Sequence, residues 1–211
     1  MMVNYDSVEF FKDRYQKHGK YGVVSDHLRN EDGYNAKTLK DTELIKEFLS
    51  RTLHGVVKKC LEVGCGTGRL SSVLLEYSKT YTGWDANDEA INLAAITNVS
   101  AFEQKDITRI KGKQPKFDFV FTFTVLQHLK DNDWNKGIEN ITKLSKNLYL
   151  YENVSFTSTE WDNKVPPHMN RKSSKDYENE LAKYGYKLQD AMPNSNNENN
   201  QRHVFMYFKK D

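Results

Sequence analysis

The sequence predicts an α/β protein with a doubly wound, mostly parallel seven-stranded sheet and an antiparallel C-terminal edge strand. First, short apolar runs alternate with segments whose apolar residues recur every three or four positions. Second, a glycine-rich turn joins the first apolar run to an amphipathic segment. Third, two apolar runs joined by a polar connector close the chain, as in a hairpin. This order favours parallel strands with helices on both faces and a hairpin at one edge.

Each element has its own local signal. Apolar runs bounded by turn residues predict strands at residues 60–63, 80–84, 100–104, 117–123, 148–151, 186–191 and 203–208. Helical periodicity predicts helices near residues 7–17, 42–53, 70–77, 88–95, 134–144 and 174–184. Asp41 or Thr42, Asn87, Asp133, and Ser173 or Ser174 are the expected N-caps. Residues 154–172 are expected to form an irregular loop, and residues 194–200 a polar tip.

Bulk properties limit the class of protein. A chain of 211 residues is suited to one domain with a substantial core. The net charge of +2 does not indicate a nucleic-acid binder, although a local basic patch stays open. No apolar stretch approaches the roughly 20 residues of a membrane span, and the N-terminus lacks the pattern of a signal peptide. With only two cysteines, Cys60 and Cys65, no disulfide framework is expected, and a reducing cytoplasm is the simplest compartment.

The most informative segment is the glycine-rich turn. It reads Glu62-Val63-Gly64-Cys65-Gly66-Thr67-Gly68, directly after the first apolar run. A strand, a glycine turn and a helix in this order make a nucleotide-sized site beside the carboxyl edge of a parallel sheet. Glycine lets the backbone approach a ligand and take positive φ values. A dinucleotide-binding fingerprint would have a further glycine where this chain has Arg69.

This segment resembles the first motif of class I S-adenosylmethionine-dependent methyltransferases, which have a Rossmann-like sheet. Three further features follow in the family's order: Asp85-Ala86, about twenty residues after Gly64; Asp106-Ile107; and the run from Phe117 to Leu129. The resemblance covers residues 58–130 well and the rest in outline. It implies S-adenosylmethionine as the methyl donor and S-adenosylhomocysteine as the product.

The resemblance also implies a set of cofactor-binding residues. Those residues are Glu62, Gly64, Cys65, Gly66, Thr67, Gly68, Asp85, Ala86, Asp106, Ile107, Thr122 and Phe123. Asp85 would accept hydrogen bonds from the ribose hydroxyls, or else cap the next helix. Asp106 would accept from the adenine amino group, or be a plain loop residue. Glu62 would lie near the amino group of the methionine part, or order the loop.

Three residues are candidates for catalysis. His128 follows the fourth predicted strand and could act as a general base, although a histidine at a helix start often bonds the backbone instead. Glu152 and Tyr151 end the fifth strand and are the second candidates, with a surface or core role as the alternative. His18, Tyr21 and His27 could belong to a lid, and His168 to the wall of an acceptor pocket. No metal is expected, because Asp131-Asn132-Asp133 reads as an exposed helix cap.

The expected protein is a single methyltransferase domain over residues 1–211. Residues 1–40 would form an N-terminal lid, residues 41–152 the cofactor-binding core, and residues 153–211 the acceptor loop, helix and hairpin. The expected acceptor is a small molecule with an oxygen or nitrogen nucleophile, with no membrane partner and an open oligomeric state. Methylation of RNA or protein stays an alternative, as does a non-catalytic cofactor-binding subunit.

Overall fold

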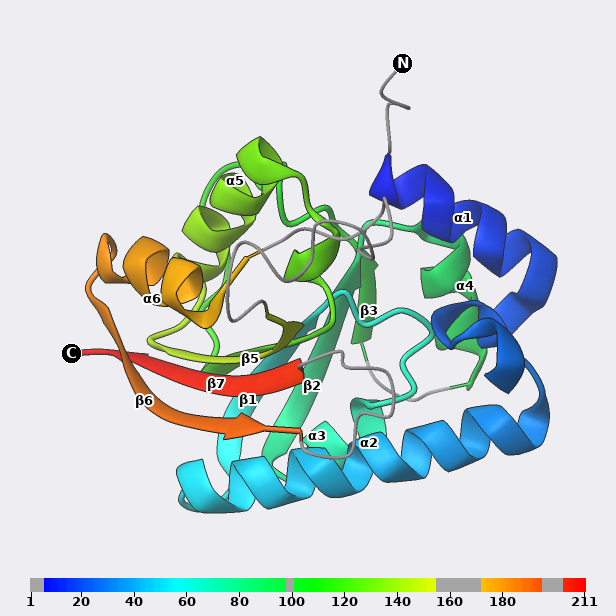
Figure 1. Ribbon diagram of the computed structural model, residues 1–211, viewed down its shortest axis with the longest axis horizontal. Helices are drawn as coiled ribbons and strands as arrows, with labels where there is room; N and C mark the ends of the chain where they lie inside the picture. Colours follow the sequence, from blue (N-terminus) through cyan, green and yellow to red (C-terminus); the bar gives the residue numbers. More distant parts are fainter. Residues whose placement is uncertain (1–5, 98–100, 155–171, 195–202) are drawn as a thin grey trace. The chain divides into compact units, whose positions relative to one another are not determined.

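The computed structural model describes residues 6–97, 101–154, 172–194 and 203–211, in two compact units, Met1–Asp106 and Ile107–Asp211. The first unit contains α1 (Ser7–His18), η1 (Gly19–Val23), η2 (Asp26–Leu28), α2 (Glu31–Thr52), β1 (Val57–Val63), α3 (Ser71–Leu75), β2 (Ser78–Asp85), α4 (Asp88–Thr97) and β3 (Ala101–Gln104). The second contains β4 (Phe119–Phe123), η3 (Leu126–His128), α5 (Asp131–Thr142), β5 (Asn147–Asn153), α6 (Ser174–Ala182), β6 (Tyr186–Pro193) and β7 (His203–Lys210). Figure 1 shows these elements.

The strand pairing confirms the predicted fold class. In the first unit the order is β3-β2-β1, with both pairs parallel. In the second unit the order is β4-β5-β7-β6, in which β4 and β5 are parallel and the β5-β7 and β7-β6 pairs are antiparallel. The seven strands therefore form a mostly parallel set with the C-terminal hairpin as its antiparallel edge.

Each unit has its own core. In the first, α2 buries Ile45, Phe48 and Leu49 completely, at the three- and four-residue spacing of an apolar helix face. In the second, every residue of β4 is buried, as expected of a parallel strand covered on both faces. Aromatic rings pack across its strands, with Tyr149 and Tyr207 stacked at 4.5 Å between ring centroids. These cores hold the strand ends from which the site residues extend.

Two predicted helix starts were wrong. The helix that was expected to start at residue 42 begins at Glu31, so residues 31–41 are also helical. Asn30 is its N-cap, accepting a hydrogen bond from Gly33 N at 2.8 Å. Asp41 is instead buried within α2 and pairs with Lys37 and, at 2.7 Å, with Arg69. Helix α5 begins at Asp131, two residues before the expected cap Asp133, with Lys130 at the N-cap position.

The remaining elements follow the predicted pattern, with boundaries shifted by a few residues. Ser173 caps α6 in a capping box with Asp176, and the side chain of Asn87 accepts from Glu89 N at the start of α4. Most of the expected acceptor loop and of the polar tip lies outside the described residues. Among the helices of the described ranges, none is long and apolar enough to cross a membrane.

Candidate cofactor and catalytic site

The glycine loop between β1 and α3 adopts a backbone that requires glycine. Gly64, Gly66 and Gly68 have φ values of +70°, +54° and +73°, in the left-handed region that other residues rarely enter. A Cβ atom on Gly66 would lie 2.9 Å from the Tyr15 hydroxyl oxygen and 3.1 Å from Cγ1 of Val23. Both the backbone and the space above it therefore explain the glycine at position 66.

Asp85 ends β2 and ties this loop to the strand. Its Oδ2 accepts from Gly66 N at 2.8 Å, and its Oδ1 accepts from Asn87 N at 2.9 Å. A carboxylate has about four acceptor positions, so not all of them are used by the loop and capacity remains for a ligand. Burial raises the pKa of Asp85, while the N–H groups of Asn87, Gly66 and Ala86 act in the opposite direction. Asp85 is thus placed to order the loop and to accept bonds from a bound molecule.

Glu62 lies under the loop rather than open to solvent. Its side chain is buried, and Tyr81 Oη donates to its Oε2 at 2.5 Å. Burial raises the pKa of Glu62 to about 8, against the opposing effects of the Tyr81 hydrogen bond and the positive charge of Arg69. This geometry fits the loop-ordering role, the second of the two roles expected from the sequence.

The raised pKa of Glu62 predicts a pH dependence of stability. In the unfolded chain this carboxyl ionises near pH 4.5, whereas in the folded protein it ionises near pH 8. Its contribution is therefore fully present below about pH 4.5 and is lost as the pH rises towards about 8, by at most roughly 1.4 kcal/mol per pH unit. Glu62→Gln keeps an acceptor for Tyr81 and should be more stable than the wild type at pH 8 but not at pH 5. Urea unfolding at both pH values checks this, and parallel stabilities would contradict it.

The end of β3 lies beside the end of β2. Asp85 pairs with Gln104 in register, and Lys105 N donates to Asp85 O at 2.8 Å. Ala86 O accepts from the Gln104 side chain at 3.4 Å. Asp106 follows directly and is partly exposed. The first unit therefore places Glu62, the glycine loop, Asp85 and Ala86 at neighbouring strand ends, with Asp106 two residues past the end of β3. That these residues bind the cofactor stays a prediction.

Two tyrosines that the sequence reading did not assign to the site also contact the loop. Tyr15 on α1 is buried, and burial, with the negative charge of Asp85 adding to it, raises its pKa. Tyr34 on α2 places its hydroxyl 3.5 Å from the Thr67 hydroxyl. The available signals were the helical spacing of Phe11 and Tyr15 and the N-cap at Asn30. Neither signal predicts which part of the protein these helices pack against.

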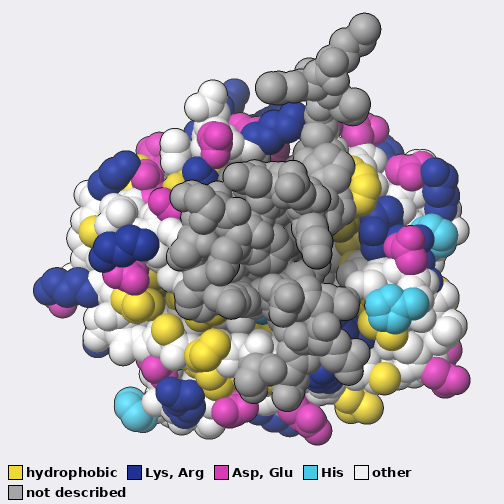
Figure 2. Space-filling model, viewed as in Figure 1, with side chains coloured by type: hydrophobic (Ala, Val, Ile, Leu, Met, Phe, Trp, Pro, Cys, Tyr) yellow, Lys and Arg dark blue, Asp and Glu magenta, His cyan; other side chains and the backbone are white. Residues whose placement is uncertain are grey.

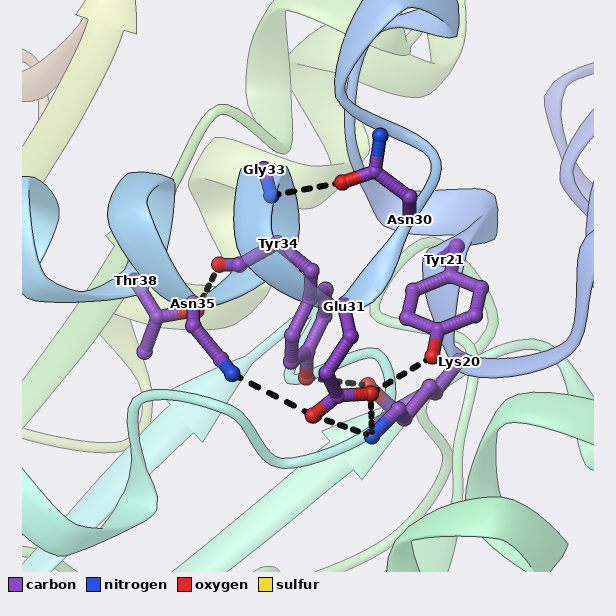
Figure 3. A network of polar contacts seen from close by, with 9 residues as sticks. Lys20, Tyr21, Asn30, Glu31, Gly33, Tyr34, Asn35 and Thr38 are labelled. Carbon is purple, nitrogen blue, oxygen red and sulfur yellow. Dashed lines mark hydrogen bonds and ion pairs between the residues drawn. The ribbon is translucent and has the colours of Figure 1, made fainter.

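Two of the three expected lid residues, His18 and Tyr21, are held by other partners. His18 Nε2 lies 2.8 Å from Arg29 Nη1, whereas His27 is exposed on η2. His168, expected in the wall of an acceptor pocket, lies outside the described residues. Tyr21 donates to Glu31 Oε2 at 2.6 Å, and Lys20 and Asn35 bond the same carboxylate (Figure 3). These bonds, led by that of Tyr21, lower the pKa of Glu31 to about 2. The network joins η1 to the start of α2, which carries Tyr34.

Gly33 makes this helix start sensitive to substitution. Figure 3 shows Gly33 donating to the Asn30 side chain at the first turn of α2. A Cβ at Gly33 would lie 2.8 Å from both Cα and O of Leu28, which are backbone atoms that cannot turn away. Gly33→Ala should therefore destabilise the protein by about 1–3 kcal/mol, although alanine is normally the better helix former. Urea unfolding should show no such loss for Asp32→Ala in the same turn, and a stabilised Gly33→Ala variant would contradict the clash.

In the second unit, β4 ends in a constrained turn. Thr124 has a φ of +59°, which is unusual for a residue with a side chain, and its N–H donates to Tyr151 O at 2.7 Å. The short helix η3 follows and carries Gln127 and His128. Sparsely populated backbone conformations of this kind gather at functional sites.

Glu152 on β5 holds this turn. It is completely buried; its Oε1 accepts from Thr122 Oγ1 at 2.8 Å and from Val125 N and Leu126 N at 3.2 Å each. Its Oε2 accepts from Gln127 N at 3.0 Å. Burial raises the pKa of Glu152 to about 7, while these four donors act in the opposite direction. Glu152 therefore accepts from three successive N–H groups of the turn and from the Thr122 hydroxyl of β4, which fits the core role that the sequence left open.

The other predicted residues of this unit lie around the same turn. Phe123 is nearly buried and stacks on Tyr151 at 4.3 Å between ring centroids, and Thr122 donates its hydroxyl to Glu152. Ile107 opens the unit, and its carbonyl accepts from Asn140 Nδ2 at 2.7 Å. His128 is half-buried, and its Nε2 lies 3.3 Å from Gln127 Nε2. The second unit thus gathers Thr122, Phe123, His128 and Glu152 at the ends of β4 and β5.

The acidic residues at the start of α5 are paired with lysines, and both cysteines of the chain are buried. Asp131 pairs with Lys172 at 2.9 Å and Asp133 with Lys136 at 3.6 Å, at the start of α5. Cys60 and Cys65 are buried free thiols, and burial raises the pKa of Cys60 to about 12. No cluster of three metal-ligating side chains occurs within the described part of the chain.

A glycine loop after β1, with acids at the ends of β2 and β3, defines the class of α/β proteins that bind a nucleoside-containing ligand at the strand ends. A family model described as a methyltransferase domain matches residues 36–191, which is most of the chain. The chain therefore belongs to this family of methyltransferase domains.

Two curated relatives of the chain share one name. Ubiquinone biosynthesis O-methyltransferases from Idiomarina loihiensis and Pelagibacter ubique are 27% and 28% identical over 119 and 141 residues. The matched segments cover 53% and 59% of this chain. The chain spans only 49% and 58% of the length of these relatives, about half in each case.

Solved structures share the fold. Magnesium protoporphyrin IX methyltransferase (ChlM) from Synechocystis PCC 6803 with bound S-adenosylhomocysteine gives a TM-score of 0.70 at 16% identity, covering 97% of this chain and 98% of that one. The N-methyltransferase NodS from Bradyrhizobium japonicum WM9, also with S-adenosylhomocysteine, gives 0.69 at 17% identity, covering 95% and 98%. At these identities the likeness shows the fold alone.

The residues of the first unit fit the chemistry of S-adenosylmethionine. Asp85 keeps acceptor capacity suited to ribose hydroxyls beside the glycine loop. The buried amide nitrogen of Asn87, beside Asp85, has no hydrogen-bond partner among the described residues. An unpaired buried donor of this kind is costly unless a ligand or water supplies the acceptor.

Proposed function

We propose that the chain moves a methyl group to an oxygen or nitrogen atom of a small-molecule acceptor by in-line displacement. The observation that carries this proposal is the turn of residues 124–128, which Glu152 fixes at the strand ends and which presents His128. The names of the relatives support it, since they describe O-methyltransferases of ubiquinone biosynthesis and an N-methyltransferase.

The two groups of residues would divide the work. Asp85, Asp106 and the glycine loop would hold the donor, with Glu62 ordering the loop and Ala86 completing the contacts within the first unit. The bound cofactor supplies a methyl group already activated by a sulfonium. The protein then has to orient the acceptor and exclude water, which can account for about 7–11 kcal/mol of the barrier in favourable systems.

The proposal keeps one functional domain with the plan expected from the sequence. Residues 1–40 would cover the cofactor, as the contacts of Tyr15 and Tyr34 with the glycine loop support. Residues 41–152 would supply the cofactor-binding core, and residues 153–211 the acceptor side.

A macromolecular acceptor has less support. The basic residues that could form an RNA-binding rim include Lys37 and Arg51, which lie fourteen positions apart on α2, roughly 21 Å at the helical rise. Lys37 pairs with Asp41. On the face drawn in Figure 2, basic and acidic side chains are interspersed over the described residues. These observations favour a small acceptor.

The test is a screen for S-adenosylhomocysteine release with phenols, amines, carboxylic acids, sugars and RNA as acceptors. Turnover with a small-molecule class and none with RNA supports the proposal. Turnover with RNA alone would show that the acceptor is RNA and not a small molecule. If no acceptor gives turnover while S-adenosylhomocysteine still binds, the chain is a non-catalytic cofactor-binding subunit and the proposal fails.

A further inference from the structure

The side-chain amide of Gln127 has a fixed orientation. Its Oε1 accepts from Asn153 N at 2.8 Å, and Gln127 itself is nearly buried. A reversed amide would set its NH₂ group against the N–H of Asn153, so that two donors would face each other. The NH₂ group therefore points the other way, where its nitrogen lies 3.3 Å from His128 Nε2.

This orientation determines which nitrogen of His128 carries the proton. An amide NH₂ group can only donate, so His128 Nε2 has to accept with its lone pair. A neutral imidazole carries one proton, and the other nitrogen, Nδ1, must then hold it. A proton on Nε2 would set two N–H groups against each other at this position.

Glu152 makes the arrangement rigid. It binds the N–H of Gln127 at 3.0 Å, and the neighbouring residue Asn153 supplies the N–H that Gln127 Oε1 accepts. The backbone and the side chain of Gln127 are thus both anchored to the end of β5. Glu152 and Gln127 are then positioning residues, and neither has to touch the acceptor.

We infer that Gln127 holds neutral His128 in the tautomer with its proton on Nδ1, so that Nε2 accepts from Gln127 and does not take a proton from a methyl acceptor. The tautomer itself follows from the contacts of Gln127. Its use on an acceptor rests on the proposed function. It argues against the general-base role at Nε2 that the sequence left open for His128.

The tautomer can be read directly by nitrogen-15 NMR of the histidine rings in the free protein at pH 8. His128 Nε2 should resonate as an unprotonated nitrogen in the wild type, with His128→Asn used to assign its signals. In Gln127→Glu the carboxylate still accepts from Asn153 N and now also accepts from the ring. His128 Nε2 should then shift to the protonated range, whether the ring is neutral or cationic.

The protein contains its own matched control. Arg29 can only donate, so His18 Nε2 must also be an acceptor, and its signal should be identical in all variants. Gln127→Met removes both side-chain bonds and should give a mixture of His128 tautomers; a retained thermal shift with S-adenosylhomocysteine verifies its folding. A protonated Nε2 in the wild type, or an unchanged tautomer in Gln127→Glu, would overturn the inference. Neither outcome depends on methyl transfer. The NMR experiment therefore tests the tautomer alone, and the S-adenosylhomocysteine-release screen separately tests the proposed function.

Discussion

Glu152→Ala is expected to lower the free energy of unfolding by about 3–5 kcal/mol. The substitution leaves the N–H groups of Val125, Leu126 and Gln127 and the hydroxyl of Thr122 without their acceptor in a fully buried place. Each buried donor that stays unsatisfied costs about 1–3 kcal/mol, and water entering the cavity would recover part of the total. Urea unfolding at pH 7, with the slope monitored for a two-state transition, measures the loss.

Two variants bracket this result. Glu152→Gln keeps one acceptor oxygen and places an NH₂ group against Gln127 N, so an intermediate loss is expected. Glu139→Ala removes an exposed glutamate of α5 that pairs with Lys143, and should change stability by less than about 0.5 kcal/mol. If Glu152→Ala lowered the free energy of unfolding no more than Glu139→Ala does, the conclusion that Glu152 anchors the turn would be wrong.

The second large effect is expected on cofactor binding. S-adenosylhomocysteine at about one hundred times its Kd should stabilise the native protein by about 2.7 kcal/mol, which is about 5–10 °C in Tm for a chain of this size. Asp85→Ala should remove most of this shift. It deletes the acceptor positions that remain for the ribose, and it also releases Gly66 N, which sets the conformation of the loop.

Asp88→Ala is the matched control for this experiment. Asp88 lies three residues further on and pairs with Lys12 at 3.4 Å at the surface, so the ligand-induced shift should be kept. Asp85→Asn retains one acceptor oxygen and should keep part of the shift. A full shift in Asp85→Ala would show that the donor is held by other residues.

Most of the fold could be predicted because each strand carries a local signal. Five apolar runs, most of them separated by helical periodicity, imply parallel pairing, and the hairpin residues 186–191 and 203–208 are separated by a polar connector. The start of α2 was missed because residues 31–41 lack an apolar stripe, so periodicity gives no signal there. Asn30 followed by Glu31 and Asp32 is nevertheless a good N-cap with acids in the first turn.

The cofactor side of the site was more predictable than the catalytic side. Gly66 and Asp85 sit at fixed positions after parallel strands, and strand ends meet at one edge of a sheet. Whether Glu152 faces a ligand or the core depends on what packs over β5, which the sequence does not encode locally. The position of Tyr15 above the loop likewise follows from helix packing and not from spacing along the chain.

The two thiols offer a built-in measure of local opening. Cys60 is wholly buried within β1, whereas Cys65 lies in the glycine loop and is only 4% exposed. A thiol reagent can modify either residue only when its surroundings open transiently, and loops open at lower free energy than core strands. Cys65 would then record excursions of the loop alone, and Cys60 the global unfolding of the unit. A ligand that holds the loop closed would slow the labelling of Cys65. The ligand itself needs neither an absorbance signal nor turnover, so cofactor analogues could be ranked by alkylation kinetics before an acceptor is known.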